Sequence, residues 1–149
     1  MAKILFVQRG PIEHLGLMSL SAIARRKGHQ VLLVFGGDKH IIRTTIAYKP
    51  DIVAFSVMLI YLRKCVQLAQ TMKKVMKKEP LVIFGGPQPT LSPEIVLENS
   101  IDLVCQGEGE GAFADVLDAY ESDNRIFTGI PNIVTKENSK FNIEPMRPL

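Results

Sequence analysis

The sequence predicts an α/β domain with a doubly wound, flavodoxin-like (Rossmann-like) sheet of five parallel strands, followed by a short C-terminal hairpin. Short, continuously apolar runs recur along the chain, as expected of strands that are buried on both faces. Longer stretches with apolar residues at helical spacing lie between these runs. Glycine, proline and aspartate mark many of the boundaries. Such an alternation of strands and helices gives a parallel sheet with helices on both faces.

The first half of the chain begins with an apolar run at residues 4–7, which predicts the first strand. A helix is expected at residues 17–27, because its last residues are basic and Gly28 follows directly, as is usual at a helix C-terminus. The second strand is expected at residues 31–35. A second helix is expected at residues 38–48, where an aspartate can cap the first turn.

The middle of the chain continues the alternation with a third strand at residues 52–55 and a fourth at residues 81–84. Between them, residues 61–78 carry apolar side chains at helical spacing, which predicts the longest helix. A short helix is expected at residues 93–99, since a serine stands at the capping position and a proline at the first helical position.

The last parallel strand is expected at residues 102–105 and the last helix at residues 110–120. Residues 132–135 and 140–143 are expected to pair as a hairpin. The remaining residues, 145–149, have the composition of a linker.

The composition argues against several classes of protein. The 149 residues carry a net charge of only +3 and no tryptophan. Four of the positive charges, at Lys73, Lys74, Lys77 and Lys78, form one solvated helix face, so nucleic-acid binding is not expected. No apolar run reaches the about 20 residues of a membrane helix. Two cysteines are too few for a disulfide framework or a zinc site, and a reduced, cytoplasmic location is expected.

The loops that follow the strands are expected to form a ligand-binding rim, because ligands of such sheets bind beyond the carboxyl ends of the strands. Gly85 and Gly86 follow the fourth strand, and Pro87 stiffens the loop after them. A Gly-Glu-Gly-Glu-Gly sequence at residues 107–111 leaves backbone amides exposed at a helix start. Either loop alone could be a tight turn, but two at one edge, together with Gly16, favour a binding rim.

Common nucleotide-binding motifs are absent from these loops. The loop after the first strand contains neither the dinucleotide fingerprint nor a flavodoxin-type phosphate turn, and the chain has no P-loop. A phosphoacceptor receiver domain needs acidic residues after the first strand and an aspartate after the third. Here Gln8, Arg9 and Ser56 stand at these places.

Six segments carry motifs in a fixed order, at residues 3–7, 14–24, 26–31, 49–56, 84–94 and 102–110. The most specific are Phe-Gly-Gly-Pro-Gln-Pro-Thr-Leu-Ser-Pro-Glu in the fifth segment and Gln-Gly-Glu-Gly-Glu at the end of the sixth. Together the segments resemble the cobalamin-binding domain found at the N-terminus of many radical S-adenosylmethionine (SAM) enzymes. The likeness extends to about Thr135.

The resemblance implies a corrin ring across the C-terminal edge of the sheet, with its nucleotide tail in the crevice. Ser56 is then expected to donate a hydrogen bond to the tail, and Gly85 and Gly86 to let the tail pass. The implied cofactor-binding residues are Leu15, Gly16, Leu17, Ser56, Val57, Met58, Gly85, Gly86, Pro87, Gln88, Gln106, Gly107 and Glu108.

The sequence departs from related patterns at two places. Other cobalamin proteins carry Asp-x-His-x-x-Gly, whose histidine binds cobalt, whereas residues 12–16 read Ile-Glu-His-Leu-Gly. His14 is therefore a candidate cobalt ligand, with a surface histidine as the alternative. No other metal ligand and no catalytic residue is expected. In addition, Gln88 stands where the family often has a histidine.

The resemblance implies part of a cobalamin-dependent radical SAM enzyme, a methyltransferase or a related one. Its iron–sulfur cluster needs a Cys-x-x-x-Cys-x-x-Cys motif, which Cys65 and Cys105 cannot supply. The cluster and SAM are thus expected only in a missing radical SAM domain. On this interpretation residues 1–130 form the cobalamin-binding-like domain and residues 131–149 a hairpin and linker, and the chain is not active alone.

Two alternatives stay open at this point. A cofactor-free, flavodoxin-like interaction domain would have its crevice filled by its own side chains, such as Met58 or Gln88. A domain for another nucleotide would bind phosphate at residues 107–111.

Overall fold

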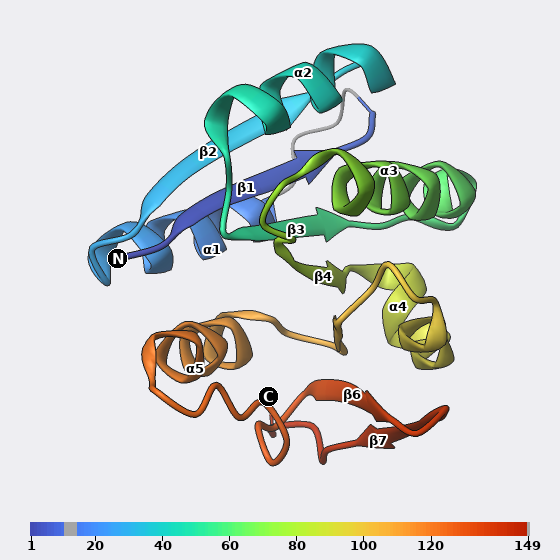
Figure 1. Ribbon diagram of the computed structural model, residues 1–149. Helices are drawn as coiled ribbons and strands as arrows, with labels where there is room; N and C mark the ends of the chain where they lie inside the picture. The colour runs from blue at the N-terminus through green and yellow to red at the C-terminus, as the bar shows by residue number, and fades with distance from the viewer. Residues whose placement is uncertain (11–14, 149) are drawn as a thin grey trace.

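All strands of the structure belong to one sheet (Figure 1). The computed structural model describes residues 1–10 and 15–148. The strands are β1 (Lys3–Gln8), β2 (Gln30–Phe35), β3 (Ile52–Ser56), β4 (Leu81–Gly85), β5 (Leu103–Cys105), β6 (Ile133–Glu137) and β7 (Lys140–Ile143). They lie in the order β2-β1-β3-β4-β5-β6-β7, and the first five are parallel. The order 2-1-3-4-5 is that of flavodoxin-like folds, so the predicted fold class is confirmed.

The sheet has seven strands instead of the expected five, because the C-terminal hairpin extends it. β6 pairs antiparallel with β5, and β7 pairs antiparallel with β6. The ammonium group of Lys136 donates to the carbonyl oxygens of Glu98 (2.7 Å) and Ile101 (2.5 Å), which fastens the hairpin to the preceding loop. Ile133 and Val134 are buried, so β6 belongs to the core.

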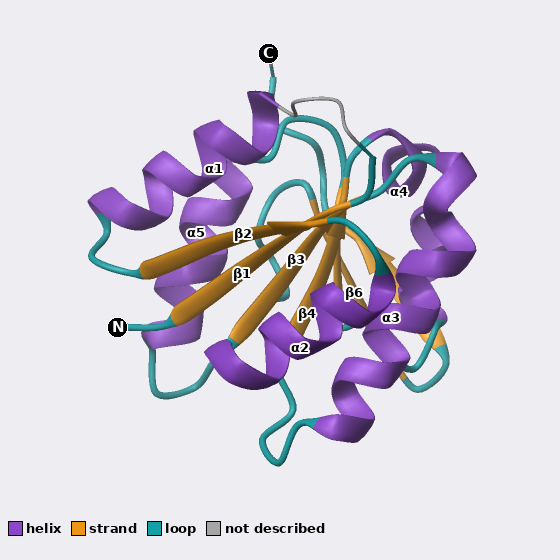
Figure 2. Cartoon of the chain, turned by 90° about the horizontal axis from the view of Figure 1, so that it is seen from above, coloured by secondary structure: helices purple, strands orange, loops and turns teal. Residues whose placement is uncertain are grey.

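Helices cover both faces of the sheet (Figure 2). The α-helices are α1 (Leu15–Arg26), α2 (Asp38–Tyr48), α3 (Leu62–Val75), α4 (Pro87–Leu91) and α5 (Glu110–Glu121). α1 and α5 pack side by side on one face, where Phe6 and Leu117 are buried; α2 and α3 cover the other, where Phe55 and Phe84 are buried. Within the part of the chain that is described, no helix is long and apolar enough to cross a membrane.

The region after β4 differs from the expected secondary structure. The helix expected at residues 93–99 is a short 3-10 helix, η2 (Pro93–Leu97), and the helix α4 precedes it. The loop expected after Gly86 is helical instead, and Pro87 and Pro89 both lie in the first turn of α4, where backbone N–H groups have no partner within the helix. Before α3, a 3-10 turn, η1 (Leu59–Tyr61), takes the place of the expected first residues.

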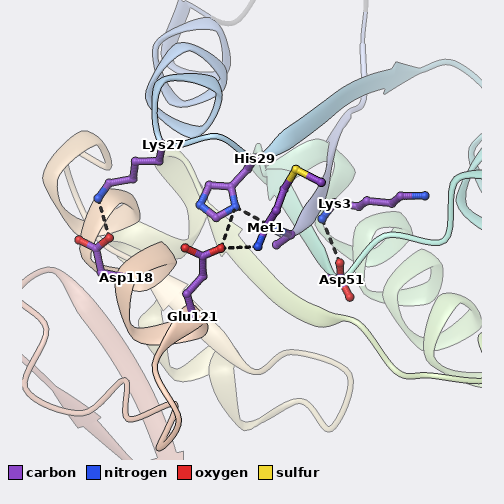
Figure 3. Close-up of polar contacts among 8 residues, drawn as sticks. Met1, Lys3, Lys27, His29, Asp51, Asp118 and Glu121 are labelled. Atoms are coloured by element: carbon purple, nitrogen blue, oxygen red, sulfur yellow. Dashed lines mark hydrogen bonds and ion pairs between the residues drawn. The ribbon is translucent and has the colours of Figure 1, made fainter.

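The edge at which the parallel strands begin is closed by polar contacts (Figure 3). Nδ1 of the buried His29 accepts a hydrogen bond from the backbone N–H of Ala2 at 3.1 Å. Glu121, at the end of α5, pairs with the amino group of Met1 at 2.7 Å. These contacts hold the start of β1 against α5. The candidate site lies at the opposite edge of the sheet, where the parallel strands end.

Candidate functional site

A cavity of about 410 Å³ opens at the C-terminal edge of the sheet, on the face covered by α1 and α5. Ala54 of β3 and Ile83 of β4, which are register partners, line it from the sheet. Leu17 of α1 and Phe113 of α5 line it from the helices. The volume lies within the range of about 300–1,000 Å³ that is usual for ligand pockets, and most of the lining is apolar.

Most of the cofactor-binding residues predicted from the sequence come together around this cavity. They are Leu15, Gly16, Leu17, Ser56, Gly85, Gly86, Pro87, Gly107 and Glu108. They lie at the ends of four different strands or in the loops after them, and they come together because the carboxyl ends of parallel strands meet at one edge. Ser56 and Gly85, for example, are register partners at the ends of β3 and β4.

The other predicted residues lie outside the cavity lining. Val57, directly after β3, is fully buried in the core on the α2/α3 side. Gln88 lines a separate groove beside η2, and Met58 directly precedes η1. Gln106 is buried, and its side-chain amide donates to the carbonyl oxygen of Thr90 at 3.0 Å. His14, the candidate cobalt ligand, lies outside the described residues.

The glycines around the cavity differ in what a side chain would meet. At Gly86 the φ angle is +103°, and a Cβ atom would lie 3.0 Å from the backbone nitrogen of Val57, so this glycine allows two loops to approach. At Gly16 a Cβ atom would meet nothing within 4 Å. At Gly85 the nearest atom, Cβ of Cys105, would be 3.8 Å away. Gly16 and Gly85 line the cavity, and close contacts within the chain do not require a glycine at either position.

The glycines of the loop after β5 contact the C-terminal segment. A Cβ atom at Gly107 would lie 3.4 Å from Sδ of Met146, and one at Gly111 would lie 3.0 Å from the guanidinium of Arg147. The same guanidinium forms an ion pair with Asp115 of α5. Packing against the C-terminal segment therefore accounts for the absence of a side chain at both glycines.

The electrostatic character of the cavity is set by few groups. Burial raises the pKa of the Cys105 thiol to about 11, so this thiol is uncharged at neutral pH. Glu108 and Glu110 stand at the start of α5, where the helix dipole favours carboxylates. In the described ranges, no group of three or more His, Cys, Asp or Glu residues could hold a metal ion. The arrangement is suited to binding an apolar group.

Several lining residues were not identified from the sequence. They are Leu20, Ala54, Phe55, Ile83, Cys105, Gly109, Glu110, Phe113, Val116 and Ile133. One signal was available: Ala54 precedes Ser56 by two positions, so both share a strand face, and it is a small residue among large ones. The helix residues carried no such signal, because an apolar residue at helical spacing looks the same whether it faces a core or a cavity.

Comparison with known proteins gives a consistent result. Residues 3–117 match the B12 binding domain family. The chain is 32% identical over 142 residues to the uncharacterized methyltransferase PH0819 of Pyrococcus horikoshii, covering 91% of this chain and 30% of that protein. It is 27% identical over 99 residues to the cobalamin-dependent radical SAM methyltransferase TokK of Streptomyces tokunonensis, covering 65% of this chain and 14% of TokK.

A solved structure shares the fold over the full chain. This is the cobalamin-dependent S-adenosylmethionine radical enzyme OxsB with aqua-cobalamin bound, with a TM-score of 0.87 and 17% identity over 100% of this chain and 23% of that chain. The present chain thus spans less than a third of the length of these relatives. Since the family match covers most of its residues, the chain belongs to the B12 (cobalamin) binding domain family, and it is similar to the domains of that kind in cobalamin-dependent radical SAM enzymes.

Proposed function

We propose that this chain holds cobalamin for a radical SAM methyltransferase, with the nucleotide tail in the cavity between α1 and α5 and the corrin ring across the C-terminal edge of the sheet. The observation that carries the proposal is the apolar cavity of about 410 Å³ at that edge. Gly16 and Gly85 line it without serving a tight packing contact of their own.

The lining fits the chemistry of the tail. An aromatic base is best accommodated by apolar side chains, which Ala54, Ile83 and Phe113 provide. The uncharged thiol of Cys105 adds no charge that would have to be desolvated. Ser56, at the end of β3, contributes a hydroxyl for a polar atom of the tail.

A rim of exposed apolar side chains lies on elements at the C-terminal edge of the sheet, and one of them, Leu15, lines the cavity. They come from α1, η1, α4 and the C-terminal segment, and each is 59% exposed or more: Leu15, Met18, Leu59, Ile60, Leu91 and Met146. Such a concentration of exposed apolar side chains is typical of a binding surface. We assign the rim to the corrin ring and to a radical SAM domain of the full-length protein, which would supply the iron–sulfur cluster, SAM and the reaction.

The alternatives from the sequence are less well supported. A cofactor-free interaction domain would have Met58 or Gln88 in the crevice, but neither residue lines the cavity. A phosphate cradle at residues 107–111 would need room beside its glycines, where the C-terminal segment packs against Gly107 and Gly111.

The proposal is tested by titration of the purified chain with hydroxocobalamin, followed by visible spectroscopy and gel filtration. The wild-type chain is expected to shift the spectrum and to elute together with the pigment. Gly16→Leu is expected to weaken binding about tenfold or more, because it fills the cavity. Gly37→Leu is the matched control: a Cβ atom there also meets nothing within 4 Å, but Gly37 lies outside the cavity. A wild-type chain that binds no pigment, or two variants that bind alike, would contradict the proposal.

A further inference from the structure

The loop after β5, which forms one wall of the cavity, is held by Asn132. This residue is only 3% exposed. The side-chain amide of Asn132 donates to the backbone carbonyl oxygen of Gln106 at 2.9 Å. The backbone carbonyl oxygen of Asn132 accepts from the backbone N–H of Gln106 at 2.8 Å. Gly107, the next residue, lines the cavity. The position of this wall therefore depends directly on Asn132.

The opposite side of Asn132 holds the C-terminal segment, residues 145–147. The side-chain oxygen of Asn132 accepts from the backbone N–H of Arg147 at 2.9 Å. Its backbone N–H donates to the carbonyl oxygen of Pro145 at 3.1 Å. The φ angle of Asn132 is +69°, a conformation that asparagine adopts more readily than most residues with a side chain. The side-chain amide of Asn132 thus donates to the cavity wall and accepts from the C-terminal segment.

The C-terminal segment also packs on the same wall directly. Sδ of Met146 lies against Gly107, and the guanidinium of Arg147 lies against Gly111 and pairs with Asp115. A displacement of the segment must therefore break these contacts or move the loop with it, because closely packed groups have few intermediate arrangements.

We infer that Asn132 is a positioning residue that couples cobalamin affinity to the position of the C-terminal segment, residues 145–147. This inference rests on the proposed function and adds a means of regulation to it. Under the proposed function, a radical SAM domain of the full-length protein acts on the segment, and Asn132 transmits the change to the cavity wall. Because coupling between two sites is reciprocal, bound cobalamin also stabilises the segment.

The first test is Asn132→Asp, compared with Asn142→Asp on the exposed strand β7. Aspartate keeps the size of the side chain and the acceptor for Arg147, but it loses the donor to Gln106. Hydroxocobalamin is expected to bind about fivefold or more weakly to Asn132→Asp, as is usual for coupled sites. The control, which introduces the same charge, is expected to bind like the wild type. Equal affinities of both folded variants would overturn the inference.

A second test separates coupling from a loss of stability. Arg147→Ala removes the pair with Asp115 and loosens the segment. The effects of Asn132→Asp and Arg147→Ala on hydroxocobalamin affinity are expected to be non-additive in a double-mutant cycle, with the thermal midpoint of each cofactor-free variant measured alongside. If the effects on hydroxocobalamin affinity are additive and parallel the changes in thermal midpoint, Asn132 has only a structural role and the inference is overturned.

The third test needs no variant at Asn132 and holds even if that variant does not fold. In the wild-type chain, hydroxocobalamin is expected to slow hydrogen exchange of the Arg147 backbone N–H, which NMR spectroscopy can follow. Unchanged exchange in a chain that binds the pigment would overturn the inference and leave the proposed function intact. A wild-type chain that binds no pigment would contradict the proposed function itself.

Discussion

Two adjacent glycines, Gly85 and Gly86, have different roles that substitution by alanine can separate. Gly86→Ala is expected to destabilise the fold by about 1–3 kcal/mol, because a side chain at φ +103° is strained and its Cβ atom lies 3.0 Å from the Val57 nitrogen. Gly85→Ala is expected to leave stability within about 0.5 kcal/mol of the wild type, since its Cβ atom has ordinary contacts, and to weaken cobalamin binding. Urea unfolding and hydroxocobalamin titration measure the two effects. Equal stabilities of the two variants would show that the strain argument is wrong.

At the scale of residues, the sequence located the loops of the candidate site but not the role of each residue. The pair Gly85-Gly86 was visible as a turn, yet only the structure shows that both line the cavity and that Gly86 alone also allows two loops to approach. The same limit applies to Gly107 and Gly111, whose partners Met146 and Arg147 lie far along the chain in the C-terminal segment. A glycine in a sequence indicates that space is needed, but it does not identify what occupies the space.

At the scale of elements, the buried His29 connects the start of β1 with the end of α5, and its titration is expected to affect stability. Burial lowers the pKa of His29, with Glu121 and Asp118 opposing this and Lys27 and the terminal amino group reinforcing it. As the pH falls, the unfolded chain therefore takes up this proton first, near its ordinary value of about 6.5. The stability that depends on neutral His29 is fully present above that value and is lost as the pH falls below it.

His29→Asn is the variant that checks this pH dependence, because an amide oxygen can accept from the Ala2 N–H without taking up a proton. The variant is expected to lose less stability than the wild type between about pH 7.5 and about pH 5.5. Urea unfolding at each pH provides the measurement. His40→Asn, at the exposed surface of α2, is the control and is expected to keep the wild-type slope. If His29→Asn loses as much stability as the wild type when the pH falls, another group controls the loss of stability at acid pH.

Most helices and strands could be predicted from the sequence, because their signals are local. The strands of the parallel sheet begin and end within a few residues of the expected positions, and α2 spans the expected residues. The helix α4 was missed, since its two prolines are typical of loops and are compatible only with a first turn. The pairing of β6 with β5 was missed as well, because an apolar run does not identify its neighbour in a sheet.

At the scale of the whole molecule, the alternation of strands and helices predicted the fold, and the ordered set of motifs predicted the family. The cavity itself could not be predicted. It depends on the distance between α1 and α5, which results from the packing of both helices on the sheet. The packing of the C-terminal segment against α5 could not be predicted either, because an Arg-Pro sequence near the end of a chain has the composition of a linker.

The boundary expected at residue 130 can be tested by two truncations. A chain ending at residue 130 loses β6, whose Ile133 and Val134 are buried; each such side chain contributes about 1.5–3 kcal/mol. It also leaves the edge of β5 unpaired, and exposed strand edges favour aggregation.

A chain ending at residue 144 keeps the sheet and loses only the C-terminal segment. We expect the shorter chain to aggregate or melt well below the full chain. The longer one should stay folded and bind hydroxocobalamin more weakly, which circular dichroism, gel filtration and titration will measure. A monomeric, fully stable chain of residues 1–130 would show instead that the hairpin is an appendage and that the cobalamin-binding unit ends before it.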